Sequence, residues 1–179
     1  MTGTPADRSR TFVEPERWYA QLATHYAATG ALITDPEGRI LLVKPYYRDH
    51  WTLPGGMVDH GETPESACAR EITEELGVNV VIGRLLVIDW APAHPPRPRP
   101  ITYFLFDAGV LTDASSIHLQ EAELDACCFV DPLQAAGRLA AHTAARLPAA
   151  LAARSARTTL YLPQETGSPA TMNSDRWGK

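Results

Sequence analysis

Short runs of apolar residues, broken by glycine, proline and polar positions, recur along the middle of this 179-residue chain. The runs from Gly30 to Thr34 and from Ile40 to Lys44 have the length of strands, and the turn-forming residues 35–38 separate them. This pattern predicts two strands joined by a turn. Further β-rich runs predict strands over Val78 to Trp90 with a bend at Gly83, over Ile101 to Leu111, and over Ala126 to Val130.

One segment has the periodicity of a helix. Thr63 is a favourable N-cap, Pro64 suits the first turn and Gly77 suits a left-handed C-terminal stop, which together predict a helix from Pro64 to Leu76. At about 100° per residue, one side of this helix is apolar and carries Cys68, Ala69, Ile72 and Leu76. The adjacent side carries the carboxylates of Glu71, Glu74 and Glu75.

Helices are also predicted near both ends of the chain. Residues from Thr11 to about Thr24 include apolar side chains that suggest a short helix packed onto the core. Ala135 to Arg154 is alanine-rich with leucines on one face, and Pro148 should kink or split this helix. From Ser155 onward, small polar residues resemble a mobile tail, in which Thr158 to Leu162 could add an edge strand.

Composition and charge limit the class of protein. The length allows one core of ordinary size, and a hydrophobic content of 45% is typical of globular domains. The formal net charge of −5 gives no basic footprint for a nucleic acid polymer and favours a small ligand. Residues 1–10 lack the apolar core of a signal peptide and no apolar run has membrane-spanning length, so we expect a cytoplasmic protein without a membrane partner. The cysteines lie in apolar segments and are expected to be buried free thiols.

The carboxylates on the predicted helix indicate a metal site. At spacings i, i+3 and i+4 they repel one another by roughly a few tenths of a kcal/mol per pair, and no lysine lies among them. A cation would relieve this repulsion, and carboxylate oxygens suit Mg²⁺ or Mn²⁺. For an arbitrary Glu-x-x-Glu-Glu the alternative is a solvated acidic face. Here the flanking residues favour the metal site.

Residues Gly56 to Val78 fit a longer pattern at every position. They read Gly-x5-Glu-x7-Arg-Glu-U-x-Glu-Glu-x-Gly-U, where U is apolar, and the chain thereby resembles the Nudix hydrolases. At ordinary residue frequencies this match is expected at a given start about once in a billion trials. The resemblance covers about Gly30 to Arg154. It implies metal-dependent cleavage of a diphosphate bond in a nucleoside diphosphate linked to another moiety, X.

The resemblance and the order of the elements also imply a fold. The fold is α/β, with a Nudix-type α/β/α sandwich around a mixed β-sheet. On this basis the chain divides into an N-terminal extension with a short helix (1–27), a Nudix hydrolase domain (28–154) and a partly flexible C-terminal tail (155–179). The family resemblance is also consistent with a homodimer.

The segment Gly56 to Val78 is the Nudix box, called the box below, and the resemblance implies further roles for its residues. It implies that the Gly56 carbonyl binds metal together with the helix glutamates, that Arg70 orients these carboxylates and that Glu62 braces the loop. In many family members another carboxylate, acting as general base or extra metal ligand, comes from a downstream loop. Glu121 and Glu123 are the matching candidates, and the alternative for each is a solvated loop charge.

Candidate substrate-binding residues lie between the second strand and the box. They are Lys44, Tyr46, Tyr47, Arg48 and His50. The cations could meet phosphates and a tyrosine could stack on a base, whereas the alternative is an exposed loop. Arg97, in the proline-rich segment 91–100, could also reach phosphate, and the alternative for that segment is a rigid connector.

The box does not identify X. Nucleotides, ADP-ribose and nucleotide sugars present the same diphosphate, and a non-nucleotide prenyl diphosphate is an alternative substrate. A non-catalytic ligand-sensing domain is a further alternative, but such domains usually carry a DNA-binding module and often a degraded box, and the sequence shows neither feature. An intact hydrolytic box also argues against an isoprenyl diphosphate isomerase.

Overall fold

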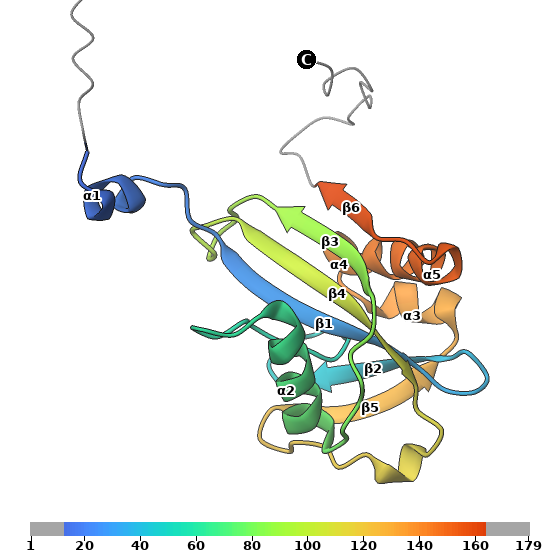
Figure 1. Ribbon diagram of the computed structural model, residues 1–179. Helices are drawn as coiled ribbons and strands as arrows, with labels where there is room; N and C mark the ends of the chain where they lie inside the picture. Colours follow the sequence, from blue (N-terminus) through green and yellow to red (C-terminus); the bar gives the residue numbers. More distant parts are fainter. Residues whose placement is uncertain (1–12, 164–179) are drawn as a thin grey trace, which may run out of the picture.

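The computed structural model describes residues 13–163, and its strands form one mixed sheet (Figure 1). The strands are β1 (Tyr26–Thr34), β2 (Ile40–Pro45), β3 (Leu85–Ala91), β4 (Ile101–Val110), β5 (Leu124–Val130) and β6 (Leu160–Pro163). Their order in the sheet is β5-β2-β1-β4-β3-β6. The pairs β1–β4 and β3–β6 are parallel, and the other neighbours are antiparallel.

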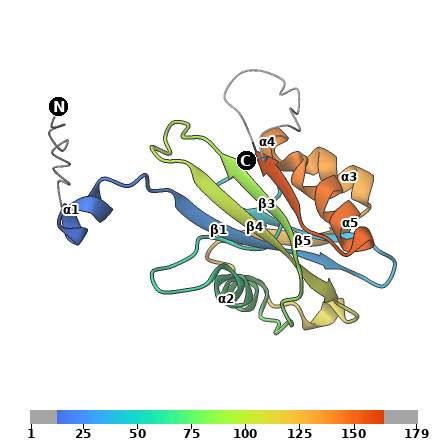
Figure 2. The ribbon, with the colours of Figure 1, turned by 45° about the horizontal axis from the view of Figure 1, so that its top comes forward.

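Helices cover both faces of this sheet (Figure 2). One face carries α2 (Pro64–Leu76), and the other carries α3 (Pro132–Arg138), α4 (Ala141–Ala144) and α5 (Arg146–Ala156). Because side chains alternate along a strand, Ala31 and Ile33 of β1 pack on the α2 side, whereas Leu32 packs on the α5 side. A hydrophobic core therefore lies on each face, and the predicted α/β/α sandwich is confirmed.

The boundaries of α2 coincide with those predicted from its caps. The Thr63 hydroxyl accepts a hydrogen bond from the Ser66 backbone N–H at 3.1 Å, and the Ser66 hydroxyl accepts one from the Thr63 N–H at 3.0 Å. Gly77 ends the helix with φ at 66°, in the left-handed region that favours glycine. Both ends of the helix are thus set by local residues, which holds Glu71, Glu74 and Glu75 at a defined place beside the sheet.

The N-terminal helix was wrongly expected to pack onto the core. The structure has a short helix, α1 (Pro15–Ala20), but none of its residues is buried, and Trp18 and Tyr19 are 49% and 65% exposed. Figures 1 and 2 show α1 standing away from the sheet. Other helices already cover both faces of the sheet, and the two aromatic rings contact each other with centroids 4.9 Å apart. Residues 11 and 12 of the predicted helix lie outside the described residues.

The helix predicted from Ala135 to Arg154 is split, as the position of Pro148 led us to expect. Breaks fall at Leu139–Ala140 and at Ala145, and Pro148 lies in the first turn of α5, where its missing N–H costs no helical hydrogen bond. The edge strand is also confirmed, because β6 pairs with β3. Residues 164–179 of the predicted tail lie outside the described residues. Within residues 13–163, no helix combines the length and apolar composition that crossing a membrane requires.

The strand predicted over Val78 to Trp90 begins later than expected. Only Leu85–Ala91 is a strand, and the preceding residues are irregular, with Val81 89% exposed. The Gly83 N–H donates to the Asp107 carbonyl at 2.7 Å, which bends the chain toward β4 at the predicted place. The β-rich composition of this segment therefore reflects packing on α2 as well as strand formation, since Val78 is buried and Val80 and Ile82 pack in the same core.

Candidate active site at the carboxylate helix

A cavity of about 640 Å³ lies at one end of the sheet. Its lining includes residues of α2 and the loop before it, and also residues of β3, β4 and α5. It brings together many of the side chains that the sequence singled out. These are Tyr47, Arg48, His50, Gly56, Arg70, Glu71, Glu74, Glu75, Arg97 and Glu123. Lys44, Tyr46, Glu62 and Glu121 do not line it.

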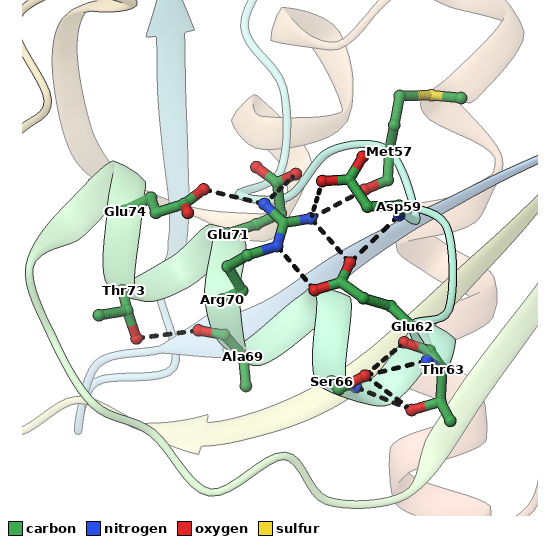
Figure 3. Close-up of polar contacts among 10 residues, drawn as sticks. All are labelled: Met57, Asp59, Glu62, Thr63, Ser66, Ala69, Arg70, Glu71, Thr73 and Glu74. Carbon is green, nitrogen blue, oxygen red and sulfur yellow. Dashed lines mark hydrogen bonds and ion pairs between the residues drawn. The ribbon is translucent and has the colours of Figure 1, made fainter.

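Arg70 is the centre of a network of carboxylates (Figure 3). Its Nε and Nη2 donate to the two oxygens of Glu62 at 2.9 and 3.0 Å, and its Nη1 donates to Glu71 at 3.1 Å and to Glu74 at 2.9 Å. The bond with Glu62 raises the pKa of the Arg70 guanidinium and lowers that of the Glu62 carboxyl. The lack of a lysine therefore does not leave these carboxylates uncompensated, because Arg70 supplies a cation from within the box.

Glu75 lies deeper than its two helical neighbours. It is 6% exposed, and its Oε2 accepts a hydrogen bond from the Gly55 N–H at 2.8 Å. Burial raises the pKa of Glu75 to about 8; Glu71 and Glu123 add to this rise, and the Gly55 N–H opposes it. Burial likewise raises the pKa of Glu71, against the effect of Arg70. The cavity thus holds carboxylates whose charge is costly without a cation.

The two glycines before α2 let the backbone approach this cluster. A Cβ placed on Gly56 would lie 2.4 Å from Oε1 of Glu71, and one on Gly55 would lie 2.4 Å from the Thr29 carbonyl oxygen. Gly55 also has φ at 133°. The Gly56 carbonyl accepts a hydrogen bond from the Thr29 N–H at 2.8 Å, which leaves its second lone pair for another partner. A side chain at Gly56 would fill the space beside Glu71, and one at Gly55 would collide with the backbone of β1.

The chemistry of these donors fits a hard divalent cation. Within residues 13–163, no three side chains of His, Cys, Asp or Glu converge as a finished metal site, and Arg70 bonds to Glu71 and Glu74 as they stand. The donors are nevertheless all oxygens, namely the carboxylates of α2 and the carbonyl of Gly56, the residue beside which the Glu71 carboxylate lies. Such a set suits Mg²⁺ or Mn²⁺, which keep several waters and bind through a few protein oxygens.

Some predicted substrate contacts are engaged elsewhere. The Lys44 ammonium donates to the carbonyls of Pro45 and Arg48, and the Tyr46 ring, 62% exposed, contacts Tyr47 edge-on. Arg97 lines the cavity, but its Nη1 and Nη2 donate to the carbonyls of Arg99 at 2.5 Å and Pro92 at 2.8 Å. This arginine therefore ties the proline-rich loop together.

The two downstream glutamates differ in position. Glu123 lines the cavity, and its charge acts on Glu71 and Glu75. Glu121 is exposed and does not line the cavity. The turn is held against α2 because the Gln120 N–H donates to the Glu75 carbonyl at 3.0 Å. Of the two candidates, the structure brings only Glu123 to the carboxylates.

Sequence reasoning missed the far wall of the cavity. This wall includes Trp51, Tyr103, Thr143 and Arg146. Arg146 donates through Nε to Asp89 at 2.6 Å, and its Cζ lies 3.9 Å from the centroid of the Tyr103 ring. Asp89 is 1% exposed, and a buried carboxylate in a predicted strand is the signal that could have pointed to a partner. The identity of that partner, 57 residues away, has no signal in the sequence.

Comparison with known proteins supports the family resemblance that the box indicates. The model of the NUDIX domain matches residues 24–151. A MutT-like protein of Streptomyces ambofaciens is 27% identical over 127 residues, which cover 71% of this chain and 77% of that protein. An ADP-ribose pyrophosphatase of Methanocaldococcus jannaschii is 35% identical over 91 residues, covering 49% of this chain and 54% of the archaeal protein.

A solved structure shows the same fold. The crystal structure of a MutT protein from Methanosarcina mazei aligns with a TM-score of 0.63 at 22% identity, covering 74% of this chain and 96% of that one. The domain model covers most of the chain, and it spans strands β1 to β5, the carboxylate helix and the residues that line the cavity. On the strength of that match, this chain belongs to the Nudix hydrolase family.

Proposed function

We propose that the protein hydrolyses a diphosphate bond in a nucleoside diphosphate linked to another moiety, with Mg²⁺ or Mn²⁺ bound at the α2 carboxylates. The observation that carries this proposal is the cluster of Glu71, Glu74 and the buried Glu75 on a cavity wall. The substrate is a small molecule of the kind named for the archaeal relative, ADP-ribose, or a related nucleotide or nucleotide sugar.

The box residues divide the work between binding and orientation. Glu71, Glu74, Glu75 and the Gly56 carbonyl would hold the cation, which when bound neutralises charge on the diphosphate. Arg70 keeps Glu71 and Glu74 side by side through its Nη1, and Glu62 holds the guanidinium in that orientation. The site is thus organised before substrate enters, which reduces the cost of ordering it during the reaction.

The proton of the attacking water needs an acceptor. Glu123 is the candidate, because it lies on the cavity wall within electrostatic reach of Glu71 and Glu75. On the same wall, Arg48 and His50 are available to the phosphate groups. A cytoplasmic location and a homodimer remain predictions.

Two other functions are less well supported. A prenyl diphosphate would need an apolar channel for its chain, whereas the far wall of the cavity carries the Asp89–Arg146 ion pair. A domain that only senses a ligand would not require every carboxylate of the box, and all of them are present here. Glu62, Glu71 and Glu74 pair with Arg70.

The proposal is tested with a panel of nucleoside diphosphate compounds and Mg²⁺ or Mn²⁺, with products identified by mass. We expect one or more to be cleaved at the diphosphate, and Glu75→Gln and Glu74→Gln to lower kcat by at least about a hundredfold because each removes a charge and keeps the volume. Glu65→Gln is the matched control, since Glu65 lies on the same helix but outside the cavity.

Wild-type-like turnover in both variants at saturating metal would contradict the metal-site assignment. Undiminished activity in EDTA would contradict the requirement for a cation. Circular dichroism of each variant checks that its fold is retained, so that a loss of turnover reports on the site.

A further inference from the structure

The cavity extends beyond the carboxylates to an arginine held at two sides. The Nε of Arg146 donates to Oδ2 of Asp89 at 2.6 Å, and its guanidinium lies on the Tyr103 ring at 3.9 Å. The side chains of Arg146 and Asp89 are 13% and 1% exposed. An ion pair on one edge and an aromatic ring on one face fix the plane of the guanidinium.

Tyr103 connects this arginine to the carboxylate cluster. A Cβ on Gly30 would lie 1.7 Å from the Tyr103 hydroxyl oxygen and 3.2 Å from the Pro54 carbonyl oxygen, so the ring reaches the turn that precedes α2. The next residue in that turn, Gly55, donates its N–H to Glu75. A ligand with its diphosphate at the carboxylates can therefore extend across Tyr103 toward Arg146.

The terminal nitrogens of Arg146 are available to such a ligand. Among the groups that the structure describes within residues 13–163, neither Nη has a hydrogen-bond partner, and the Nε–Asp89 bond is the polar contact that Arg146 makes. No buried side-chain nitrogen or oxygen of that range lacks a partner, so these nitrogens are open to solvent. Since Arg146 lines the cavity, they present a planar fork of two donors to it.

The charge around this fork favours a neutral acceptor. The buried Asp89 carboxylate already neutralises Arg146, and the cavity carries further carboxylates on α2. A phosphate would bring two negative charges beside the buried Asp89 carboxylate, whose charge already offsets that of Arg146. A neutral group with two adjacent acceptor atoms satisfies both donors without that cost.

Among nucleobases, the N7 and O6 edge of guanine or hypoxanthine meets this requirement. Adenine places an amino donor beside N7, which would oppose one Nη. The O2 and N3 acceptors of cytosine lie toward the sugar, whereas N7 and O6 lie on the far side of the purine from the ribose bond. The Trp51 ring and the apolar residues Ala91 and Ile101 also line the cavity and offer surface to a purine.

We propose that Arg146, held by Asp89 and Tyr103, selects a 6-oxopurine nucleotide by donating its two terminal N–H groups to N7 and O6 of the base. The proposal rests on the proposed function, in which the diphosphate lies at α2. It also has a chemical consequence for oxidised nucleotides. In 8-oxoguanine the N7 atom carries hydrogen and cannot accept, so this fork disfavours the oxidised base.

Binding of mononucleotides to the Mg²⁺-loaded protein, measured by calorimetry, tests the proposal independently of turnover. We expect GMP and IMP to bind about five- to 150-fold more tightly than AMP. The analogue 7-deaza-GMP, in which carbon replaces N7, should lose most of this advantage. Ribose 5-phosphate, which has no base, should bind no more tightly than AMP.

Variants locate the preference. Arg146→Lys keeps the charge beside Asp89 but removes the planar fork. The affinity for GMP should therefore fall to that for AMP, while the affinity for AMP changes less than about twofold. Arg84→Lys is a matched change outside the cavity and should leave the ratio of the GMP and AMP affinities unchanged. If Arg146→Lys does not fold, the comparison of GMP with 7-deaza-GMP on the wild-type protein still decides the matter.

Several outcomes overturn the proposal. These are equal binding of GMP and AMP, equal binding of GMP and 7-deaza-GMP, or a ribose 5-phosphate affinity that matches GMP and depends on Arg146, which would assign the fork to phosphate. Metal-dependent hydrolysis without a 6-oxopurine preference would reject this inference alone. Arg146-dependent GMP binding without hydrolysis of any diphosphate would reject the proposed function alone.

Discussion

At the scale of single residues, Glu121 and Glu123 share a turn but have different surroundings, which makes them a direct test of the proton acceptor. Glu123 lines the cavity and Glu121 does not. We expect Glu123→Gln to lower kcat by about 10²- to 10⁴-fold with little change in KM, because a general base acts in the transition state. Glu121→Gln should stay within about twofold of wild type. Steady-state kinetics across pH 6 to 9 at saturating Mg²⁺ measure both variants.

The Glu123→Gln variant keeps the volume of the side chain but removes the carboxylate that would accept the proton. Normal kcat across that range in this variant would remove Glu123 from the mechanism. The proton would then pass to a glutamate of α2. A loss of kcat in Glu121→Gln alone would mean that the turn rearranges when substrate binds.

Cys68 provides a second test at this scale. It is fully buried on the side of α2 that packs on the sheet, and burial raises the pKa of its thiol to about 11. Because the thiolate is the reactive form, only about 1% of this thiol would be ionised at pH 9 even if reagent reached it. In the native protein we expect its labelling by a maleimide to be slow at pH 7 and to remain slow at pH 9. Labelling at full rate in urea, located by peptide mass, is the positive control.

A Cys68 thiol that labels quickly at pH 9 without denaturant would show that α2 opens from the sheet. Cys127 and Cys128 are half-buried on β5 and give an internal comparison, since both are free and more accessible.

The residues of the site divide into those that a sequence can reveal and those that it cannot. Glu71, Glu74 and Glu75 were predictable because a helix with local caps sets their spacing and places them on one side. Arg146 was not, because its role depends on Asp89 and Tyr103, which reach it only through the packing of α5 on the sheet. Lys44 shows the opposite error, since a cation near the box was expected to face phosphate and instead bonds to backbone carbonyls.

At the scale of elements, one arginine anchors α5 to the sheet. Arg154 donates through Nη2 to the Leu32 carbonyl and to Asp107, both at 2.6 Å, and through Nη1 to the Thr34 hydroxyl at 3.2 Å. We expect Arg154→Met to lower the free energy of unfolding by about 1.5–3 kcal/mol, because it leaves a charged acceptor and a carbonyl without their donor. Urea denaturation measures the change.

The matched control is Arg157→Met, three residues later. The Arg157 side chain is exposed and makes no polar contact with residues 13–163 in the described structure, so this change should stay within about 0.5 kcal/mol. Equal destabilisation by both substitutions would mean that the network around Asp107 adds little to the docking of α5.

Elements with local signals were predicted well, and those that depend on distant surfaces were not. The ends of α2 follow from Thr63 and Gly77, which act within one turn of the helix. The packing of α1 could not be judged in this way, because its apolar residues allow burial but the sheet has no uncovered face for them. The position of the break before Pro148 likewise depends on how α3 and α5 fit the sheet.

At the scale of the whole molecule, metal binding should stabilise the fold. A cation that binds the native state at a hundredfold excess over its Kd adds about 2.7 kcal/mol, which for a domain of this size corresponds to a rise of roughly 5–10 °C in Tm. We expect Mg²⁺ or Mn²⁺ to produce such a rise and EDTA to reverse it. Differential scanning fluorimetry at matched ionic strength measures it.

The same titration on Glu75→Gln provides the control, because this variant lacks one of the proposed ligands. Its shift should be much smaller than that of the wild type. A shift of equal size in both proteins would place the stabilising cation away from α2, and no shift in either would contradict metal binding at the concentrations used.

The class of the fold was predictable, but the arrangement of its strands was not. Strands before and after the box helix, with helices following, indicate an α/β/α sandwich. They do not indicate that β1 lies between β2 and β4, or that β1 and β4 run parallel. That order decides which residues line the cavity, since it brings Ala28 and Thr29 of β1 beside Ile101 and Tyr103 of β4.

The parallel pairing of β1 with β4 also has a consequence for synthesis of the chain on the ribosome. β1 ends at Thr34, but its partner begins at Ile101. At typical translation rates the intervening residues take roughly 3–13 seconds to make. Throughout that interval one edge of a strand that is almost wholly buried in the finished fold has no partner, and such an edge can pair with another nascent chain. The finished protein encloses this strand between two others, so the hazard belongs to the growing polypeptide and ends once β4 has been made.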